Sequence, residues 1–345
     1  MKTVALTEFG AAENLTDAHA ERPAIEAHEV LIQIRACGFN PIDYQIRQAG
    51  FEALEPPMVL GFEVAGVVSD IGSGITTLAR GQEVMAWLGG PSLAGGYAEY
   101  AAVPAAFVTR KPEKVSFAQA AAVPLAGLTA LRSLRRGRLS GHRSLLVAGG
   151  AGGVGSWAIL LAKALGAHRI VTTAGSESSR DYLRTHLGLA DDQIIGYADM
   201  SRADLAAAAR AANEGALFDV TVDCVGKRMT SLCCDVVDFE GTVISLVNAP
   251  KDNSYPPEDA DEEALFRRSA AFHCELAFAQ AEYGSPSSYP AYTEPLDYLS
   301  ALISQGSLTL PRVTTLGNLC AVTARAAHRL LESGHTHGKL VAVVD

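Results

Sequence analysis

One stretch decides the fold of this 345-residue chain: Ser144-Leu145-Leu146-Val147-Ala148-Gly149-Gly150-Ala151-Gly152-Gly153-Val154-Gly155. The apolar run Ser144–Ala148 predicts a buried strand, and the glycines after it have the spacing G-x-G-x-x-G. Apolar residues then recur at the spacing of a helix, which is expected to run to Leu165; they are Ala158, Leu161, Ala162 and Leu165. Strand, glycine turn and helix in this order predict the start of a parallel sheet.

The alternation of strand and helix continues to about residue 276. Further apolar runs predict strands at residues 170–174, 193–195, 218–224, 242–247 and 268–276, and residues 204–212 predict a helix. Residues 248–263 are rich in Pro, Asp and Glu and lack periodicity, so they predict an exposed loop. The segment 124–276 is therefore expected to form a doubly wound parallel sheet with helices on both faces.

Residues 1–123 have a different pattern, in which short apolar stretches are separated by glycines. Strands are expected at residues 30–37, 58–68, 83–87 and 97–103. Glycine turns and bulges between such strands are typical of a sheet that curls into a partly closed barrel. Residues 277–345 are expected to return to this β-rich domain, and a chain of this length favours two cores.

Composition excludes several classes of protein. With 48% hydrophobic and 19% charged residues the chain is globular, and a net charge of −10 without runs of Lys or Arg argues against a nucleic-acid partner. No apolar run reaches the roughly 18 residues of a membrane helix, and Glu8 and Glu13 are unlike a signal peptide. We therefore expect a cytoplasmic protein. Six scattered cysteines without CxxC spacing favour neither disulfides nor a zinc knot.

The glycine motif predicts a binding site for the pyrophosphate of a dinucleotide. Gly150 is expected to permit a tight turn, Gly152 to let the backbone approach the anion, and Gly155 to let helix and strand pack closely. The helix N-terminus adds N–H groups and a partial positive charge, both of which attract an anion.

The residues after the next predicted strand indicate which dinucleotide is bound. They read Thr173-Ala174-Gly175-Ser176-Glu177-Ser178-Ser179-Arg180. A carboxylate at this place binds the ribose hydroxyls of NAD, whereas a basic residue pairs with the 2′-phosphate of NADP. Ser176 can donate a hydrogen bond to a phosphate, and Arg180 follows one helical turn later. Glu177 stands where an NAD-type carboxylate would, so NAD remains the alternative to the expected NADPH.

Several other motifs occur in a fixed order along nearly the whole chain. They are Ala36-Cys37-Gly38-Phe39-Asn40-Pro41-Ile42-Asp43, Gly61-Phe62-Glu63-Val64-Ala65-Gly66, Gly95-Gly96-Tyr97-Ala98-Glu99-Tyr100, Gly127-Leu128-Thr129-Ala130, residues 219–226, Ala327-His328-Arg329 and Gly338-Lys339. With these motifs the chain resembles the medium-chain dehydrogenase/reductase superfamily, in particular its quinone oxidoreductase (zeta-crystallin-like) branch. The resemblance implies an α/β protein with a GroES-like catalytic domain at 1–123, a Rossmann NADP-binding domain at 124–276, and a C-terminal return at 277–345.

The resemblance also assigns residues to a cofactor that lies in the cleft between domains. It places Asn40, Thr129 and Asn248 beside the nicotinamide, and Gly153 and Val154 on the pyrophosphate. Around the 2′-phosphate it places Ser176, Arg180 and Tyr197.

Tyr44 is the candidate proton donor, because it follows Asn40-Pro41-Ile42-Asp43 in the segment that should face the nicotinamide. A role for Tyr44 as a wall of the pocket is the alternative. Asp43 and Arg47 are expected to make structural hydrogen bonds within that loop, and the nine histidines are expected to be surface or core residues.

The chain departs from the zinc-dependent alcohol dehydrogenases of the same superfamily. Those enzymes carry Gly-His-Glu where this chain has Gly61-Phe62-Glu63, and Cys37 alone cannot hold a catalytic zinc, so we expect no metal site. Oxidation of an alcohol would lack its Lewis acid, whereas an electron-poor acceptor does not need one.

We therefore expect an NADPH-dependent oxidoreductase that transfers a hydride to a quinone or a similar electron-poor carbonyl compound. Two alternatives are an enoyl or alkenal double-bond reductase, and a non-enzymatic NADPH-binding structural or RNA-binding protein. Because relatives in this branch are commonly dimers through the edge of the Rossmann sheet, residues 268–276 are expected to be the edge strand of a homodimer.

Overall fold

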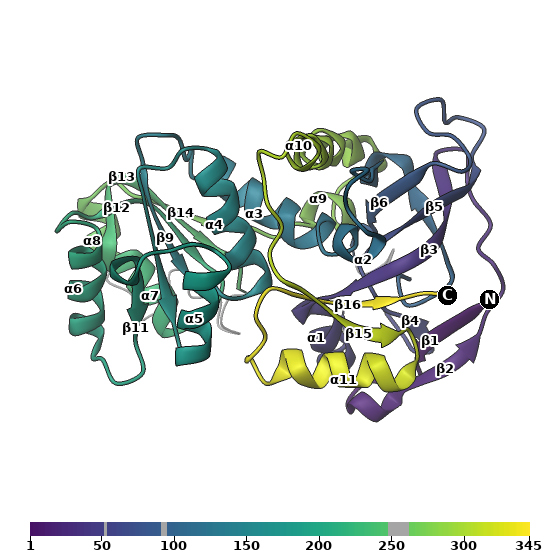
Figure 1. Ribbon diagram of the computed structural model, residues 1–345, viewed down its shortest axis with the longest axis horizontal. Helices are drawn as coiled ribbons and strands as arrows, with labels where there is room; N and C mark the ends of the chain where they lie inside the picture. The colour runs from purple at the N-terminus through teal and green to yellow at the C-terminus, as the bar shows by residue number, and fades with distance from the viewer. Residues whose placement is uncertain (52–53, 91–94, 248–261) are drawn as a thin grey trace. The chain divides into compact units, whose positions relative to one another are not determined.

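The computed structural model describes residues 1–345 except 52–53, 91–94 and 248–261 (Figure 1). It contains two compact units: unit 1 comprises Met1–Leu128 and Ala277–Asp345, and unit 2 comprises Thr129–Leu276. The loop predicted at residues 248–263 lies outside the described residues except for its end, where Glu262 instead begins a helix. No helix in the described part of the chain is long and apolar enough to cross a membrane.

Unit 2 is built on a six-stranded parallel sheet, as predicted. Its strands are β9 (Ser144–Ala148), β10 (Arg169–Ala174), β11 (Ile194–Gly196), β12 (Phe218–Asp223), β13 (Val237–Ser245) and β14 (Ala271–Cys274). Their order is β11-β10-β9-β12-β13-β14, so the chain changes direction across the sheet at β9. In such sheets ligands bind outside the carboxyl ends of the strands at this switch point.

Helices connect these strands and cover both faces of the sheet. They are α3 (Pro124–Arg136), α4 (Gly153–Ala164), α5 (Glu177–Thr185), α6 (Arg202–Ala212), α7 (Arg228–Val236) and α8 (Glu262–Arg267). Apolar residues of α6, α7 and α8 form one buried cluster with the sheet, and α4 and α5 lie over the other face (Figure 1). The doubly wound architecture is therefore confirmed.

Unit 1 is rich in β-strands, which confirms the prediction for the first part of the chain. A three-stranded sheet has the order β2-β1-β4, and a larger sheet has the order β15-β16-β3-β5-β6-β8, with β7 paired to β3. The bounds are β1 (Lys2–Leu6), β2 (Leu15–His19), β3 (Glu29–Phe39), β4 (Met58–Val59), β5 (Glu63–Ile71), β6 (Glu83–Trp87), β7 (Tyr100–Pro104), β8 (Val108–Arg110), β15 (Val313–Asn318) and β16 (Lys339–Val343). Because β16 pairs with β3, the C-terminal segment returns to this unit as expected.

Unit 1 also contains helices. These are α1 (Pro41–Ala49), α2 (Phe117–Ala120), α9 (Ala279–Glu282), α10 (Thr293–Ser304) and α11 (Ala321–Glu332). Short 3-10 helices span Ala12–Asn14, Ala105–Phe107 and Pro286–Tyr292 in unit 1 and Asp191–Gln193 in unit 2.

Two predictions for unit 1 were wrong. The single strand expected at residues 58–68 is interrupted between β4 and β5, where Gly61 has a φ of 99° and a Cβ would lie 2.9 Å from the backbone N of Tyr97. The segment after Asn40 is a helix and not a loop, because the Asp43 carboxylate accepts from the backbone N–H of the N-cap residue Asn40 and Pro41 fixes the first turn.

Candidate functional site

Two physical reasons explain the glycines of the turn between β9 and α4: backbone conformation and close packing. Gly149 has a φ of 84°, so the left-handed residue of the turn stands one position before Gly150. At Gly150 a Cβ would lie 2.2 Å from the Thr172 hydroxyl of β10, and at Gly155 it would lie 2.2 Å from the carbonyl oxygen of Gly149. Gly150 and Gly155 are therefore required by packing within the protein.

Gly152 differs from these glycines because the protein leaves space beside it. Among the described residues, a Cβ at Gly152 would meet only the carbonyl oxygen of Gly149, at an ordinary contact distance of 3.5 Å. Gly152 is also the N-cap of α4, which has neither a side-chain cap nor an acidic residue in its first turn. The N–H groups of Gly153 and Val154 therefore begin a helix whose N-terminus suits an anion.

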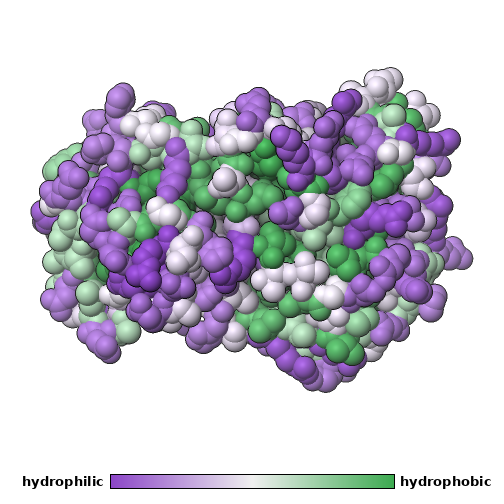
Figure 2. Space-filling view, viewed as in Figure 1, coloured by the Kyte–Doolittle hydropathy of each residue, from purple (hydrophilic) through white to green (hydrophobic). Residues whose placement is uncertain are grey.

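Ser176, Arg180 and Tyr197 converge where β10 and β11 end. Ser176 caps α5 by accepting a hydrogen bond from the Ser179 amide at 3.2 Å. A Cβ at Gly175 would lie 2.7 Å from the Tyr197 hydroxyl, and a Cβ at Gly196 would lie 3.4 Å from Arg180 Nη2. The surface over α5 is hydrophilic (Figure 2). The structure thus brings together the three residues assigned to a 2′-phosphate.

Charged side chains in and around the cluster of Ser176, Arg180 and Tyr197 affect its affinity for an anion. The Arg180 guanidinium is 26% exposed and pairs with Asp191 Oδ1 only at the long distance of 3.7 Å. Glu177 is an exposed residue in the first turn of α5. Arg228 was not predicted: its guanidinium carbon lies 6.0 Å from the centre of the Tyr197 ring. Only its position just after the motif at residues 219–226 could have pointed to it.

The loop after β12 belongs to the motif at residues 219–226, and sequence analysis did not predict that it lies next to the glycine turn. Buried Asp223 shapes this loop by accepting hydrogen bonds from the amides of Val225 at 2.9 Å and Gly226 at 2.8 Å. Val225 is 48% exposed, and a Cβ at Gly149 would lie 2.6 Å from its Cγ2 atom. This loop therefore places an apolar side chain beside Gly149, the first glycine of the turn.

Thr129 lies in α3. Ion pairs connect this helix to Glu275, directly after β14. The side chain of Glu275 is fully buried, and it accepts hydrogen bonds from Arg132 Nε at 2.7 Å and from Arg136 Nε. Arg132 follows Thr129 by nearly one helical turn, so these ion pairs fix the part of α3 that carries Thr129. Asn248 lies outside the described residues.

Asn40 belongs to a buried polar network in unit 1. Its Nδ2 atom donates to Glu63 Oε1 at 2.9 Å, and its Oδ1 atom accepts from Lys339 Nζ at 2.5 Å. Lys339 also pairs with Glu63 at 2.6 Å, and the second Glu63 oxygen accepts from the Leu125 amide at 2.8 Å. Both ends of the Asn40 amide are therefore held in place by the protein.

Tyr44 and Asp43 are neighbours on α1 with different surroundings. Tyr44 is half-buried, and its hydroxyl makes no hydrogen bond with any residue that the structure describes. Asp43 is fully buried and accepts hydrogen bonds from the amides of Asn40 at 2.6 Å and Gly61 at 3.1 Å. Burial raises the pKa of the Asp43 carboxyl to about 7, against the lowering effects of the Asn40 hydrogen bond and the charge of Lys339. The predicted structural role of Asp43 agrees with these contacts.

The position that binds zinc in related dehydrogenases is apolar in this chain. Phe62 is 1% exposed, and Cys37 is fully buried, which raises the pKa of its thiol. Among the residues with a described placement, no three His, Cys, Asp or Glu side chains come close enough to hold a metal ion. These residues do not fit a catalytic zinc.

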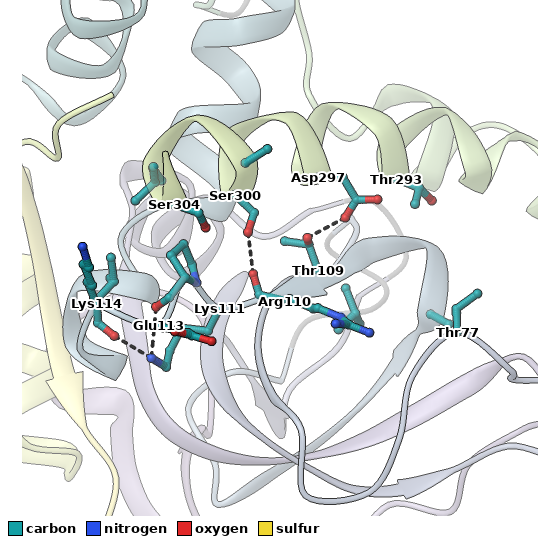
Figure 3. Close-up of a pocket in the computed structure, with 16 residues that line it drawn as sticks. Thr77, Thr109, Arg110, Lys111, Glu113, Lys114, Thr293, Asp297, Ser300 and Ser304 are labelled. Atoms are coloured by element: carbon teal, nitrogen blue, oxygen red, sulfur yellow. Dashed lines mark hydrogen bonds between the residues drawn. The ribbon is translucent and has the colours of Figure 1, made fainter. Parts of the chain in front are cut away.

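Unit 1 also has a groove of about 680 Å³ between β8 and α10 (Figure 3). Its polar groups bond to one another: Thr109 donates to Asp297 at 2.6 Å, and Ser300 donates to the carbonyl of Arg110 at 2.7 Å. None of the described candidate residues lines this groove, so it is separate from the predicted site.

Comparisons with known proteins agree with this architecture. The alcohol dehydrogenase GroES-like domain matches residues 26–113, and the zinc-binding dehydrogenase family matches residues 153–278. The chain is 37% identical to 2-methylene-furan-3-one reductase of Solanum lycopersicum and 36% identical to a chloroplastic NADPH-dependent alkenal/one oxidoreductase of Arabidopsis thaliana. Each alignment covers 72% of this chain but only 63% of the relative.

A solved structure matches over the full length. The quinone oxidoreductase of Coxiella burnetii is 30% identical, with a TM-score of 0.80 over 100% of this chain and 99% of that one. The two family matches lie in the order that the sequence motifs predicted, one in each unit. The chain therefore belongs to the medium-chain dehydrogenase/reductase superfamily, in its quinone oxidoreductase branch.

Proposed function

We propose that this protein is an NADPH-dependent reductase that transfers a hydride to a quinone. One observation carries the proposal: the open glycine turn at Gly152 stands beside a strand end where Ser176, Arg180 and Tyr197 converge. The turn suits a pyrophosphate, and the serine, guanidinium and phenol suit the 2′-phosphate that distinguishes NADPH from NADH. The name of the Arabidopsis relative, which specifies NADPH, supports the same cofactor.

In the proposed reaction, bound NADPH supplies the hydride. The backbone around Gly152, Gly153 and Val154 binds the pyrophosphate, and Asn40, Thr129 and Asn248 orient the nicotinamide. The hydroxyl of the half-buried Tyr44 donates the proton to the acceptor oxygen. A quinone that gains one hydride and one proton becomes a hydroquinone, so the balance needs no further reactant.

The second candidate is reduction of the carbon–carbon double bond of an α,β-unsaturated carbonyl compound. The names of the two plant relatives favour it, because both describe enone or alkenal substrates. The hydride would then be added to the β-carbon, and the proton to the α-carbon. Both candidates use the same cofactor site and differ in the acceptor and in the atoms that receive the hydride and the proton.

A steady-state assay tests the proposal. We expect saturable oxidation of NADPH with members of a panel of quinones, and weaker or no oxidation with matched enones. Faster oxidation with enones would favour double-bond reduction. Binding of NADPH without oxidation by any acceptor would instead favour the non-enzymatic NADPH-binding protein.

We expect the purified protein to contain less than one zinc per chain and to keep its activity in a chelator. The physical reason is that Phe62 replaces a nitrogen ligand by a hydrocarbon ring and that the thiol of Cys37 is buried. Elemental analysis and an assay in the chelator check this prediction. One tightly bound zinc per chain, with loss of activity on its removal, would contradict it.

We also propose a homodimer that forms through the edge of the unit 2 sheet. The strand β14 stands at the end of the described strand order of this sheet, and edge strands can pair with a second copy. Phe266 is 87% exposed in α8, shortly before this strand, and burying it would favour association.

Light scattering at micromolar concentration should give twice the chain mass of 36.2 kDa. We expect Phe266→Arg to shift the protein toward monomer, because it introduces like charges into the interface. Val322→Arg is the matched control, since Val322 is 70% exposed but lies in unit 1. A monomeric mass for the unaltered protein would rule out the dimer.

Two further properties remain predictions. One is a cytoplasmic location, and the other is the absence of a nucleic-acid partner, which rests on the net charge of −10.

A further inference from the structure

His328 is fully buried in α11 and connects two other buried polar residues. Its Nδ1 atom accepts a hydrogen bond from Arg47 Nε at 3.2 Å, and its Nε2 atom lies 3.1 Å from the Tyr97 hydroxyl. Tyr97 in turn bonds to the carboxyl of Asp43. No residue in this chain of four is more than 1% exposed. The motif Ala327-His328-Arg329 therefore has a structural partner on α1, 281 positions away in sequence.

The chemistry of Arg47 sets the direction of each hydrogen bond. A guanidinium can only donate, so Nδ1 of His328 must accept and the ring proton must be on Nε2. That N–H donates to the oxygen of Tyr97, which leaves the Tyr97 hydroxyl to donate to Asp43. Burial, together with the charge of Arg47, lowers the pKa of His328 to about 3, so the ring is neutral at physiological pH.

Asp43 and Arg47 are four positions apart and so lie on one face of α1. Arg47 also donates to the carbonyl of Gly10 and pairs with Glu332, and Asp43 holds the amides of Asn40 and Gly61. Hydrogen bonds of Asp43 and Arg47 therefore hold the buried face of α1 near both of its ends. His328 links these two sets of hydrogen bonds, through Arg47 on one side and Tyr97 on the other.

We propose that His328 is a positioning residue that sets the orientation of α1 and thereby the positions of Asn40 and Tyr44. The inference rests on the proposed function, in which these two residues face the nicotinamide and the acceptor. Tyr44 directly follows Asp43, so a rotation of α1 about its axis moves the Tyr44 hydroxyl. A displacement of about 1 Å at a reacting group can cost a factor of about 100 in rate.

Two substitutions separate positioning from simple packing. His328→Gln keeps an acceptor for Arg47 and a donor for Tyr97, whereas His328→Leu fills a similar volume with neither. We expect His328→Leu to lower kcat by about tenfold to hundredfold with the KM for NADPH nearly unchanged. His328→Gln should recover most of this loss. His186→Leu is the matched control, because His186 is an exposed histidine of unit 2.

The readouts exclude a purely structural role. Unfolding in denaturant gives conditions under which each variant is fully folded, and binding of 2′,5′-ADP reports on the cofactor site of unit 2. At the assay temperature, the folded fraction of each variant and its affinity for 2′,5′-ADP should match those of the unaltered protein. A folded His328→Leu variant with unchanged kcat would overturn the proposal, as would a His328→Gln variant as slow as His328→Leu.

Hydrogen exchange tests the same inference without any activity. His328→Leu should speed amide exchange in α1 while α4 of unit 2 keeps its protection. Unchanged exchange in α1 would overturn the role of His328. If no acceptor supports oxidation of NADPH by the unaltered protein, the proposed function fails. The exchange experiment still decides whether His328 orients α1.

Discussion

Arg180→Ala is expected to raise the KM for NADPH about tenfold to hundredfold and to leave the KM for NADH nearly unchanged. A guanidinium next to a phosphate makes charge-assisted hydrogen bonds worth about 1.5–3 kcal/mol, which corresponds to this factor. The long 3.7 Å pair with Asp191 leaves the Arg180 guanidinium available for such a partner. Because the 2′-phosphate is far from the hydride, kcat should change little. Steady-state kinetics with both cofactors measures the effect.

Two neighbours of Arg180 serve as controls. Arg184 lies on the same helix and pairs with Asp181 at 3.2 Å, so Arg184→Ala should leave the cofactor preference unchanged. Glu177→Ala tests the alternative in which this carboxylate binds the ribose of NAD. An unaltered protein that prefers NADH, and loses this preference in Glu177→Ala, would overturn the assignment of NADPH.

Gly152→Val should weaken the binding of both cofactors by about a hundredfold or more. Its methyl groups would fill the space next to the first turn of α4 and keep the pyrophosphate from at least two backbone N–H groups, each worth about 1.5–3 kcal/mol. The variant should fold, because a Cβ at Gly152 meets the protein only at 3.5 Å and the φ of −73° suits any residue. Calorimetric titration with NADPH measures the loss.

The other glycines of the turn show why Gly152 is the informative position. Gly155→Val would force a side chain within 2.2 Å of the Gly149 carbonyl, so it should destabilise unit 2 itself. Gly152→Ala adds a single methyl group and should give an intermediate loss of affinity. Unchanged affinity in a folded Gly152→Val variant would mean that the pyrophosphate binds elsewhere.

Local signals predicted the centre of unit 2 well. The strand β9 matches the predicted run Ser144–Ala148, because an apolar stretch ended by glycines leaves few alternatives. The prediction for β13 was poorer: it begins at Val237 and not at residue 242, since Glu240, with a φ of 56°, interrupts the apolar pattern. A positive φ at a glutamate has no sequence signature, so the sequence did not predict its effect on the start of β13.

The candidate site was predictable only where its contacts are local. Ser176 caps α5 and Arg180 lies in its first turns, and their position just after a predicted strand indicated a shared target. Asn40 and Arg47 bond to Lys339 and His328, which lie about 300 positions away in the sequence. No sequence periodicity predicts contacts between residues so far apart. The segment of α1 did carry a signal for a helix, an asparagine at the N-cap position followed by proline, but we predicted a loop there.

The most direct test of the central claim is the oxidation of NADPH, followed by absorbance, in a chelator with a quinone as the only acceptor. We predict that one NADPH is oxidised for each quinone reduced, that the rate saturates with both, and that deuterium at the transferred position of the nicotinamide slows it. NADPH that binds at the Arg180 site but is not oxidised by any quinone or enone would contradict the assignment of this protein as a reductase.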